Sequence, residues 1–324
     1  MAIKDSGSSL AISEIVAEFG DAAGGSDSLS EYYAGGQNVP SGATGESGSI
    51  PTSGTISMSQ FYGSTNRIAI ALQISSTTQN YNIYANRGGT YSSGISDVTL
   101  TVQAIVGSAG TGQYAIDTGN QWASGDTVKI INNSQIVGAG GAGGAGGSTQ
   151  GVGAAGGGGG AALNLGIDTT VQNDGGRIRG GGGGGGGGGT ARGVFVVDKN
   201  NQVALENGGG GGGGGTGQSG GGGGAGGNSG QAGQAGSVSS NGAGGTGGTS
   251  SQGGSSVKGG NGGAGGSFGT AGQAGQAGST TGGSPESTDH RAGGAAGAAG
   301  KAINLNGNSV TYEDGSSNID GAVS

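Results

Sequence analysis

The feature that most constrains the fold is an uninterrupted run of ten glycines, Gly180–Gly189, followed by a second run, Gly208–Gly215. Ordering glycine costs more backbone entropy than ordering any other residue, and glycine has no side chain to bury. Such runs belong either to a flexible linker or to a structure whose backbones pack too closely for a Cβ atom. Most of the 92 glycines lie between Gly138 and Gly300, and 3 prolines are too few for collagen.

A period of three residues within the glycine-rich region argues against a linker. The stretch GAGGAGGAGG at Gly138–Gly147 spaces its alanines three apart, and QAGQAGS occurs at Gln231–Ser237 and again at Gln273–Ser279. A left-handed helix of the polyproline II type has three residues per turn and no internal hydrogen bonds, so neighbouring rods of this kind must bond to one another. We expect Gly180–Gly189 and Gly208–Gly215 to be interior rods. The segments with Ala or Gln are expected to be outer rods, with those side chains facing out.

The segments around the predicted rods indicate β structure. Residues 67–137 alternate or cluster β-branched and aromatic residues between Gly, Asn and Ser turns, which predicts a small antiparallel β domain. Ala161–Ile178 and Gly193–Asn207 read as β-hairpins, the second turning at DKNN. The predicted fold class is mostly β and irregular. It comprises short N-terminal helices (1–66), the antiparallel β domain, a polyglycine II (left-handed threefold helix) sandwich with β-hairpin insertions (138–300) and a C-terminal β segment (301–324).

A related motif recurs where a predicted strand meets glycine. NNSQIVG at Asn132–Gly138 and NDGGRIRG at Asn173–Gly180 each pair a polar turn with an isoleucine two residues before the run. We interpret each motif as a strand that continues into a rod.

A short repeat marks the first 66 residues. ISEIV at Ile12–Val16, LSEYY at Leu29–Tyr33 and MSQFY at Met58–Tyr62 share one pattern, and a glycine follows each within a few residues. Serine suits an N-cap, an acidic residue the first turn and glycine the C-terminal end, so the repeat predicts three very short helices. Such helices are not stable alone, so their apolar pairs must dock on one another or on another protein. The candidate virion-attachment residues are these pairs: Ile15, Val16, Tyr32, Tyr33, Phe61 and Tyr62.

Composition and charge disfavour several classes of function. A net charge of −8 disfavours nucleic acid as a partner. With no cysteine and His290 as the only histidine, we expect no metal site, no cofactor and no nucleophile–base pair. Asp117 and Asp126 suit strand-end turns better than a glycoside-hydrolysing pair, so the chain is not expected to be an enzyme. The N-terminus does not read as a signal peptide, and no stretch approaches the length of a transmembrane helix.

Several stretches together resemble a known family. They are LSEYY…VPSG…IPTSGTISMSQFYG at Leu29–Gly63, VKIINNSQIVGAGGAGGAGG at Val128–Gly147, GGAAGAAGKAINLNGNSVTYEDG at Gly293–Gly315, and the glycine runs. Their combination is similar to bacteriophage tail-fibre and tail-tip adhesins that carry a polyglycine sandwich. Residues 67–137 do not match that pattern.

The resemblance implies a virion protein, located in a tail fibre or tail tip, that recognises a host cell-surface receptor. It implies that residues 1–66 attach to other phage tail or baseplate proteins. It also implies that loops between rods contact an outer-membrane protein or polysaccharide, without membrane insertion. The alternative is a purely structural connector or spacer at the junction of baseplate and fibre. A third possibility is an ice-binding polyglycine protein with a flat Thr- or Ala-bearing face.

Receptor contacts should lie where rods turn, because the restriction to glycine is lifted there and side chains project. The candidate loops are Ser237–Asn241, Thr249–Lys258, Ser267–Thr270 and Ser279–Arg291. Rods that alternate in direction put only every second turn at the far tip, so some of these loops face the other way. Phe268 either contacts the receptor or caps the apolar end of the stack. The candidate receptor-binding residues are Ser237, Asn241, Lys258, Phe268, Glu286, Asp289, His290 and Arg291.

Overall fold

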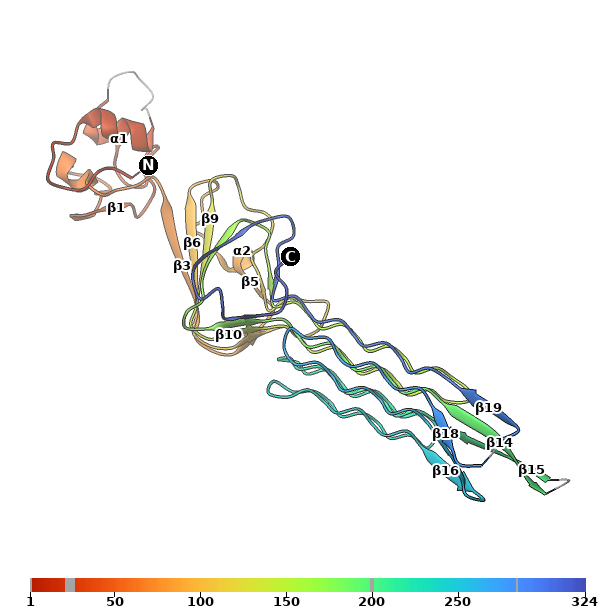
Figure 1. Cartoon of the computed structure of the whole chain (residues 1–324). Coiled ribbons are helices and arrows are strands. Elements are labelled where there is room, and N and C mark those ends of the chain that lie inside the picture. Colours follow the sequence, from red (N-terminus) through yellow and green to blue (C-terminus); the bar gives the residue numbers. More distant parts are fainter. Residues whose placement is uncertain (1, 21–26, 199–200, 284) are drawn as a thin grey trace. The chain divides into compact units, whose positions relative to one another are not determined.

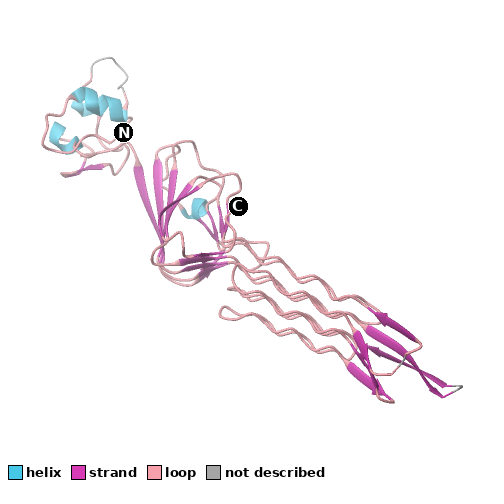
Figure 2. Cartoon of the chain, viewed as in Figure 1, coloured by secondary structure: helices cyan, strands magenta, loops and turns pink. Residues whose placement is uncertain are grey.

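The computed structural model describes residues 2–20, 27–198, 201–283 and 285–324 (Figure 1). The chain divides into two compact units. The first comprises residues 1–72, 87–99 and 122–128, and the second comprises residues 73–86, 100–121 and 129–324. Strands and irregular segments dominate and helices are few (Figure 2), which confirms the predicted mostly-β fold class.

All three helices expected from the N-terminal repeat are present. They are α1 (Ile12–Phe19) and two 3-10 helices, η1 (Leu29–Glu31) and η2 (Met58–Phe61); the same region holds the antiparallel pair β1 (Thr44–Gly45) and β2 (Gly48–Ser49). The repeated serine does not form the N-cap, which lies two residues earlier. Instead, the side chain of the Glu or Gln that follows this serine accepts the backbone N–H of the N-cap residue. Glu14, Glu31 and Gln60 accept the N–H of Ala11, Ser28 and Ser57 at 2.8, 2.9 and 2.8 Å.

The three helices dock on one another. Ile15, Tyr32 and Phe61 are completely buried, and the rings of Phe19 and Phe61 meet edge to face with centroids 6.0 Å apart. At the end of α1, Gly20 takes a φ of +92° and donates its N–H to the Val16 carbonyl at 2.8 Å, the closing role expected of that glycine. Internal docking is therefore the alternative that the structure selects for these apolar pairs.

Residues 67–137 and 301–324 form parallel sheets that wind as a three-sided β-solenoid. The first sheet has the order β21 (Val310–Asp314), β12 (Thr169–Gln172), β9 (Thr127–Asn132), β6 (Ser96–Val102), β3 (Ile68–Ile74). The second has the order β22 (Ile319–Asp320), β13 (Arg177–Arg179), β10 (Gln135–Val137), β7 (Val106–Gly107), β4 (Thr78–Gln79). The third has the order β20 (Ile303–Asn304), β11 (Leu163–Asn164), β8 (Ile116–Asp117), β5 (Tyr81–Asn82), and a short helix, α2 (Ile83–Asn86), follows β5.

The antiparallel prediction for residues 67–137 is wrong. Every pairing within the second and third sheets is parallel, as is that of β12 with β21. Each strand pairs with the strand one coil later, so neighbours along the chain lie on different sides of the solenoid. Alternating burial, as in β6, is common to both pairing directions and does not identify the partner strand.

Ala161–Ile178 is part of the solenoid and does not form the predicted hairpin. Its strands β11, β12 and β13 occupy three successive sides. Buried aliphatic side chains such as Ile136 and Ile178 fill the interior. At one corner, the buried Asn132 amide donates to Asn173 Oδ1 at 2.7 Å. Asp117, in β8, accepts from the amides of the neighbouring coils, so it belongs to a ladder between strands.

Glycine-rich rods leave the solenoid after β10 and β13 and return at β11 and β20. The rods are residues 138–147, 151–160, 180–189, 208–216, 220–227, 230–237, 241–248, 259–266, 270–278 and 291–300. They run side by side (Figures 1 and 2). This arrangement matches the predicted polyglycine sandwich.

The rod Gly180–Gly189 lies at the centre of the lattice. Its N–H groups donate with a period of three: Gly181, Gly184 and Gly187 to rod 151–160, Gly182, Gly185 and Gly188 to rod 208–216, and Gly183, Gly186 and Gly189 to rod 270–278. Its carbonyls accept from rods 138–147, 259–266 and 291–300. The rod 208–216 is surrounded by six rods in the same manner. Gly180–Gly189 and Gly208–Gly215 are buried throughout, which confirms them as interior rods.

The predicted outer rods do carry their side chains outward. Ala142 and Ala145 are exposed, whereas Ala139, next to the solenoid, is buried. The Gln and Ala side chains of Gln231–Ser237 and of Gln273–Ser279 are exposed as well. The three-residue period of the sequence is therefore the period at which exposed positions recur along the rod.

Two small antiparallel sheets cap the far end of the rods, which we call the tip. One has the order β15 (Asn201–Asn207), β14 (Ala191–Asp198), β19 (Ser287–His290), and the other has the order β16 (Thr249–Gln252), β17 (Ser255–Lys258), β18 (Ser279–Thr281). The β14–β15 pair confirms the hairpin predicted at Gly193–Asn207, whose turn at 199–200 lies outside the described residues. Ala191, Phe195 and Val257 form a buried core between the two sheets, with Leu205 packed against it.

A methyl group in the central rod tests the close packing. A Cβ at Gly185 would lie 2.0 Å from the Gly263 carbonyl oxygen, whereas one at Gly222 would meet nothing within 4 Å. We expect Gly185→Ala to lower the free energy of unfolding by about 1–3 kcal/mol. Gly222→Ala should leave it unchanged or raise it by up to about 1 kcal/mol, because alanine restricts the unfolded chain. Denaturant titration of both variants measures the difference, and equal effects would contradict the lattice.

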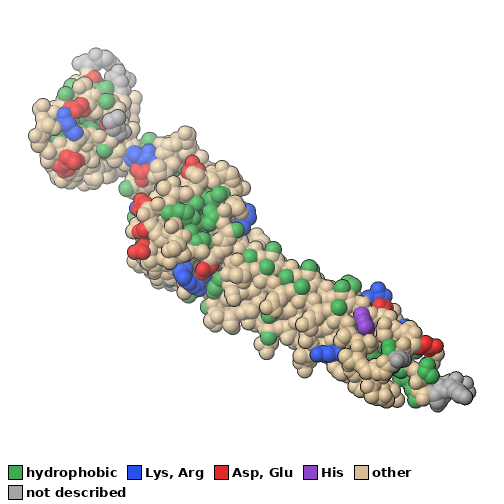
Figure 3. All heavy atoms as spheres, viewed as in Figure 1, with side chains coloured by type: hydrophobic (Ala, Val, Ile, Leu, Met, Phe, Trp, Pro, Cys, Tyr) green, Lys and Arg blue, Asp and Glu red, His purple; other side chains and the backbone are tan. Residues whose placement is uncertain are grey.

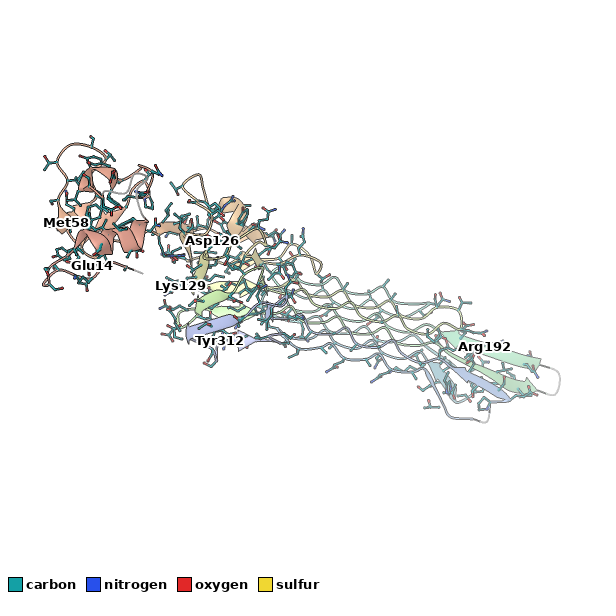
Figure 4. All side chains as sticks on the ribbon, turned by 90° about the horizontal axis from the view of Figure 1, so that it is seen from above. Glu14, Met58, Asp126, Lys129, Arg192 and Tyr312 are labelled. Atoms are coloured by element: carbon teal, nitrogen blue, oxygen red, sulfur yellow. The ribbon has the colours of Figure 1, made fainter. Side chains whose placement is uncertain are left out.

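A carboxylate organises the turns of the first unit. Asp126, labelled in Figure 4, accepts hydrogen bonds from the Tyr91 hydroxyl at 2.6 Å and from the N–H groups of Gly94, Ser96 and Ala123 at 2.9, 3.1 and 2.9 Å. Burial raises the pKa of Asp126, but these hydrogen bonds outweigh burial and hold the pKa below its ordinary value. Asp126 thus stabilises turns at strand ends, as expected from the sequence.

This shift predicts a pH dependence of stability. Because the folded pKa is lowered, the ionised carboxylate stabilises the native state above the ordinary Asp value of about 4. That stabilisation is lost as the pH falls through the folded value. We expect the melting temperature of the wild type to fall between about pH 5 and pH 2 more steeply than that of Asp126→Asn, which starts lower. Calorimetry across this range gives both slopes, and parallel slopes would contradict the assignment.

Candidate recognition surface

Successive rods alternate in direction, so their turns fall at two opposite ends. Turns 217–219, 238–240 and 267–269 lie at the end where rods leave β10 and β13, since Gly140 donates its N–H to Ser219 and Gly269 donates to Gly180. Turns 148–150 and 228–229 lie at the tip with the two sheets. Every second turn therefore projects at the tip, as expected from sequence.

Five of the predicted receptor-binding residues lie together at the tip. Lys258 ends β17, Glu286 precedes β19, Asp289 and His290 lie within β19, and Arg291 follows it. Asp289 opposes Arg192 of β14 across the sheet, and Arg291 bridges to Asp289 at 2.9 Å. His290 Nε2 lies 3.2 Å from the hydroxyl of Thr280. The Gln202 side chain donates to Glu286.

The other three predicted residues, Ser237, Asn241 and Phe268, lie at the solenoid end, and each contributes to the structure there. Ser237 Oγ accepts the N–H of Ser240 at 3.0 Å, and the Asn241 amide donates to the Gly265 carbonyl at 2.5 Å. Phe268 stacks under the Arg179 guanidinium, 4.8 Å from the ring centroid. This contact with Arg179 supports the alternative that Phe268 caps the end of the stack.

Sequence reasoning missed several tip residues. Val152, Val196 and Val197 are exposed there at 64%, 56% and 49%. Thr149 and Gln150 take positive φ values, and the Gln150 N–H donates to Glu206 at 2.8 Å. The apolar run Phe195–Val197 in β14 is a visible signal in the sequence, but it predicts only a β-hairpin. Positive φ at Thr149 and Gln150 has no sequence signal, because neither residue type favours that conformation.

Charge is distributed unevenly along the second unit. No Lys, Arg, Asp or Glu occurs from residue 208 to 257, and the flank of the rods is nearly free of charged side chains (Figure 3). Charged groups and the histidine gather around the tip sheets, where Arg192 is labelled in Figure 4. The tip thus combines ionic, polar and exposed apolar side chains.

The described residues show no arrangement typical of a metal centre or a membrane span. Within that part of the chain, no group of His, Asp and Glu is placed to hold a metal ion. Nor does any described helix combine the length and apolar character that a bilayer requires.

The candidate attachment residues of the N-terminal region need correction. Ile15, Tyr32 and Phe61 are core residues with no exposed surface, so they present nothing to a partner. They are inside because the short helices obtain their stability from one another. The second residues of the pairs are half-buried: Val16 packs on the core, Tyr33 donates its hydroxyl to Gly54, and Tyr62 donates to Ser8 at 2.5 Å.

A different apolar set of the same repeat is partly exposed. The first residue of each motif, namely Ile12, Leu29 and Met58 (labelled in Figure 4), packs against the core and keeps part of its surface in solvent. These three occupy the same position in each of the three helices. The repeat thus has an inward set and a partly outward set of apolar side chains.

Together, the solenoid, the hydrogen-bonded rods and the tip define a protein that presents turns at the end of a glycine-rich scaffold, as expected of an adhesin. The chain belongs to the phage tail fibre adhesin Gp38 family, whose model matches residues 69–324. Residues 67–137, which did not match the expected pattern in sequence, fall almost entirely within this range. The protein is therefore a receptor-recognising adhesin of the virion tail fibre.

A solved structure is also similar to this chain. It is the gp37-gp38 adhesin tip complex of the bacteriophage S16 long tail fiber, with 21% sequence identity and a TM-score of 0.42 over 84% of this chain and 88% of that chain. No curated protein sequence matches significantly.

Proposed function

We propose that the tip sheets and turns contact the host receptor, and that the N-terminal region (residues 1–66) attaches the adhesin to a tail protein. The proposal for the tip is carried by one observation. Charged and exposed apolar side chains gather at the tip, while the rods between tip and solenoid are nearly uncharged. Turns on a rigid scaffold are the usual site of recognition, since their side chains are free of packing constraints.

The proposed receptor contacts combine the predicted cluster with the residues that sequence reasoning missed. Arg291, Asp289 and Glu286 supply ionic and hydrogen-bonding groups, and Val196 and Val197 supply apolar surface at the end of β14. An outer-membrane protein or a polysaccharide offers partners for the polar groups, and a protein surface also covers the valines. A purely structural spacer needs neither exposed valines nor a charged cluster at its end.

The proposal for attachment rests on Ile12, Leu29 and Met58. Partly exposed apolar side chains at equivalent positions of three helices form a repeated surface that a partner could cover. Residues 1–66 precede the range that the family model matches, consistent with a role separate from the recognition unit. We propose that these three residues, rather than the buried Ile15, Tyr32 and Phe61, contact the tail protein.

Two valines with similar exposure form a matched pair for testing the tip. Val196 lies at the tip with 56% exposure, and Val238 lies in a turn at the opposite end of the rods with 50% exposure. We expect Val196→Glu to weaken binding of the purified protein to host cells by at least about tenfold, since a charge would be buried on binding. Val238→Glu should bind as the wild type does. Equal binding of both variants, with unchanged melting temperatures, would contradict recognition at the tip.

A second pair tests attachment. We expect Met58→Glu to abolish incorporation of the adhesin into virions, because a carboxylate would be buried against the tail protein. The exposed Ser53→Glu should assemble normally. Quantitative blotting of purified particles measures incorporation, and calorimetry confirms that each variant folds. Normal incorporation of folded Met58→Glu protein would contradict this attachment surface.

A further inference from the structure

The glycine runs do not specify their own register. A threefold helix of identical residues is unchanged when the chain advances by one residue, that is, by about 3.1 Å with a rotation of one third of a turn. Within Gly180–Gly189, such a slip replaces every glycine except one at the end of the run by another glycine. The inter-rod hydrogen bonds along the rest of the run are kept. An outer rod such as Gly138–Gly147 can slip by three residues, because its alanines repeat at that period. The register must therefore be set where the rods end.

At the solenoid end, the rods continue the hydrogen bonding of the parallel sheet without a break. Strands β10 and β13 pair Ile136 with Ile178, and immediately afterwards the Gly138 N–H donates to Arg179 at 2.8 Å. The bonds from Gly141 to Gly182, from Gly144 to Gly185 and from Gly147 to Gly188, all 2.8 Å, keep the same sequence separation. The register between the paired strands of the sheet thus continues into the rods.

The return to the solenoid repeats this arrangement. Gly153, Gly156 and Gly159 donate to Ala292, Ala295 and Ala298 at 3.0, 2.9 and 2.9 Å. Ala162 then donates to Lys301 at 3.0 Å with the same separation, next to the pairing of β11 with β20. Both groups of rods that touch the solenoid therefore inherit their register from paired strands.

At the tip, side-chain packing holds the opposite ends of the rods. Phe195 and Val257 are buried between the two sheets, and β14 and β15 pack against β17. The Asn207 amide, directly before the rod at 208–216, donates to the Val257 carbonyl at 2.8 Å, and Ser250 Oγ lies 2.9 Å from Asn207 Oδ1. These contacts join the ends of several rods through residues other than glycine.

We propose that these two regions act as register clamps, with Ile178 in the solenoid clamp and Phe195 in the tip clamp as positioning residues. The rods transmit register between the clamps but do not create it. A slip of one residue in a central rod would turn the attached hairpin by a third of a turn and move it by about 3.1 Å. The clamps thereby fix where the tip residues stand. This inference is independent of which molecule the tip binds.

Hydrogen exchange of the full-length protein tests the proposal, because each clamp should protect only its own end of the rods. We expect Phe195→Ala to speed exchange at Gly187–Gly189 and Gly208–Gly210 by at least about tenfold, without change at Gly181–Gly183. Ile178→Ala should speed exchange at Gly181–Gly183 and leave Gly187–Gly189 unchanged. The conservative variants Phe195→Leu and Ile178→Val should restore most of the protection. Val238→Ala is the control with no expected change.

The pattern along the rods decides the outcome. Fraying confined to the end nearest each substitution supports two separate clamps. A uniform change along the rods, including one caused by the mild Phe195→Leu substitution, would show that the lattice opens as a single unit. No change at either end would show that the rods hold their own register. Either of these last two results would overturn the proposal.

Discussion

Direct hydrogen bonding between the backbones of neighbouring glycine rods is the constraint on which the rest of the structure depends. Each central rod donates to three neighbours and accepts from three others, with N···O distances of 2.7 to 3.0 Å. At this spacing a Cβ on Gly184 would lie 1.9 Å from the Ala142 carbonyl oxygen. The interior therefore excludes side chains, and the entropy cost of ordering glycine is offset by a backbone network that is complete on every side.

That exclusion leaves side-chain packing to the ends and the outer faces of the rods. Apolar packing occurs around Ile136 and Ile178 in the solenoid and around Phe195 in the tip core. Charged side chains likewise lie at the solenoid and the tip, with few along the rods. The flank of the rods exposes mainly Gly, Ala and Gln and few charged side chains. The proposed recognition at the tip agrees with this arrangement, since the chain carries residues of diverse chemistry there.

Much of the fold could be predicted from residue patterns, and the errors share one cause. The interior rods, the outward alanines, the three helices and the β14–β15 hairpin depend on interactions close in sequence or on the period of one segment. The parallel solenoid does not. Ile178 pairs with Ile319, and Leu163 pairs with Ile303, so each partner lies beyond a long excursion of rods. Alternating burial within one strand contains no information about such distant partners.

The candidate sites divide in the same way. The sequence by itself determined where glycine is required and hence which turns can carry side chains, because exclusion of a Cβ acts at each position separately. Only the tertiary structure decided which turns face the tip, placing Arg291 there and Phe268 at the solenoid. It also decided that Ile15, Tyr32 and Phe61 form a core rather than a docking surface. Both outcomes depend on the direction and packing of whole segments, which no single residue pattern specifies.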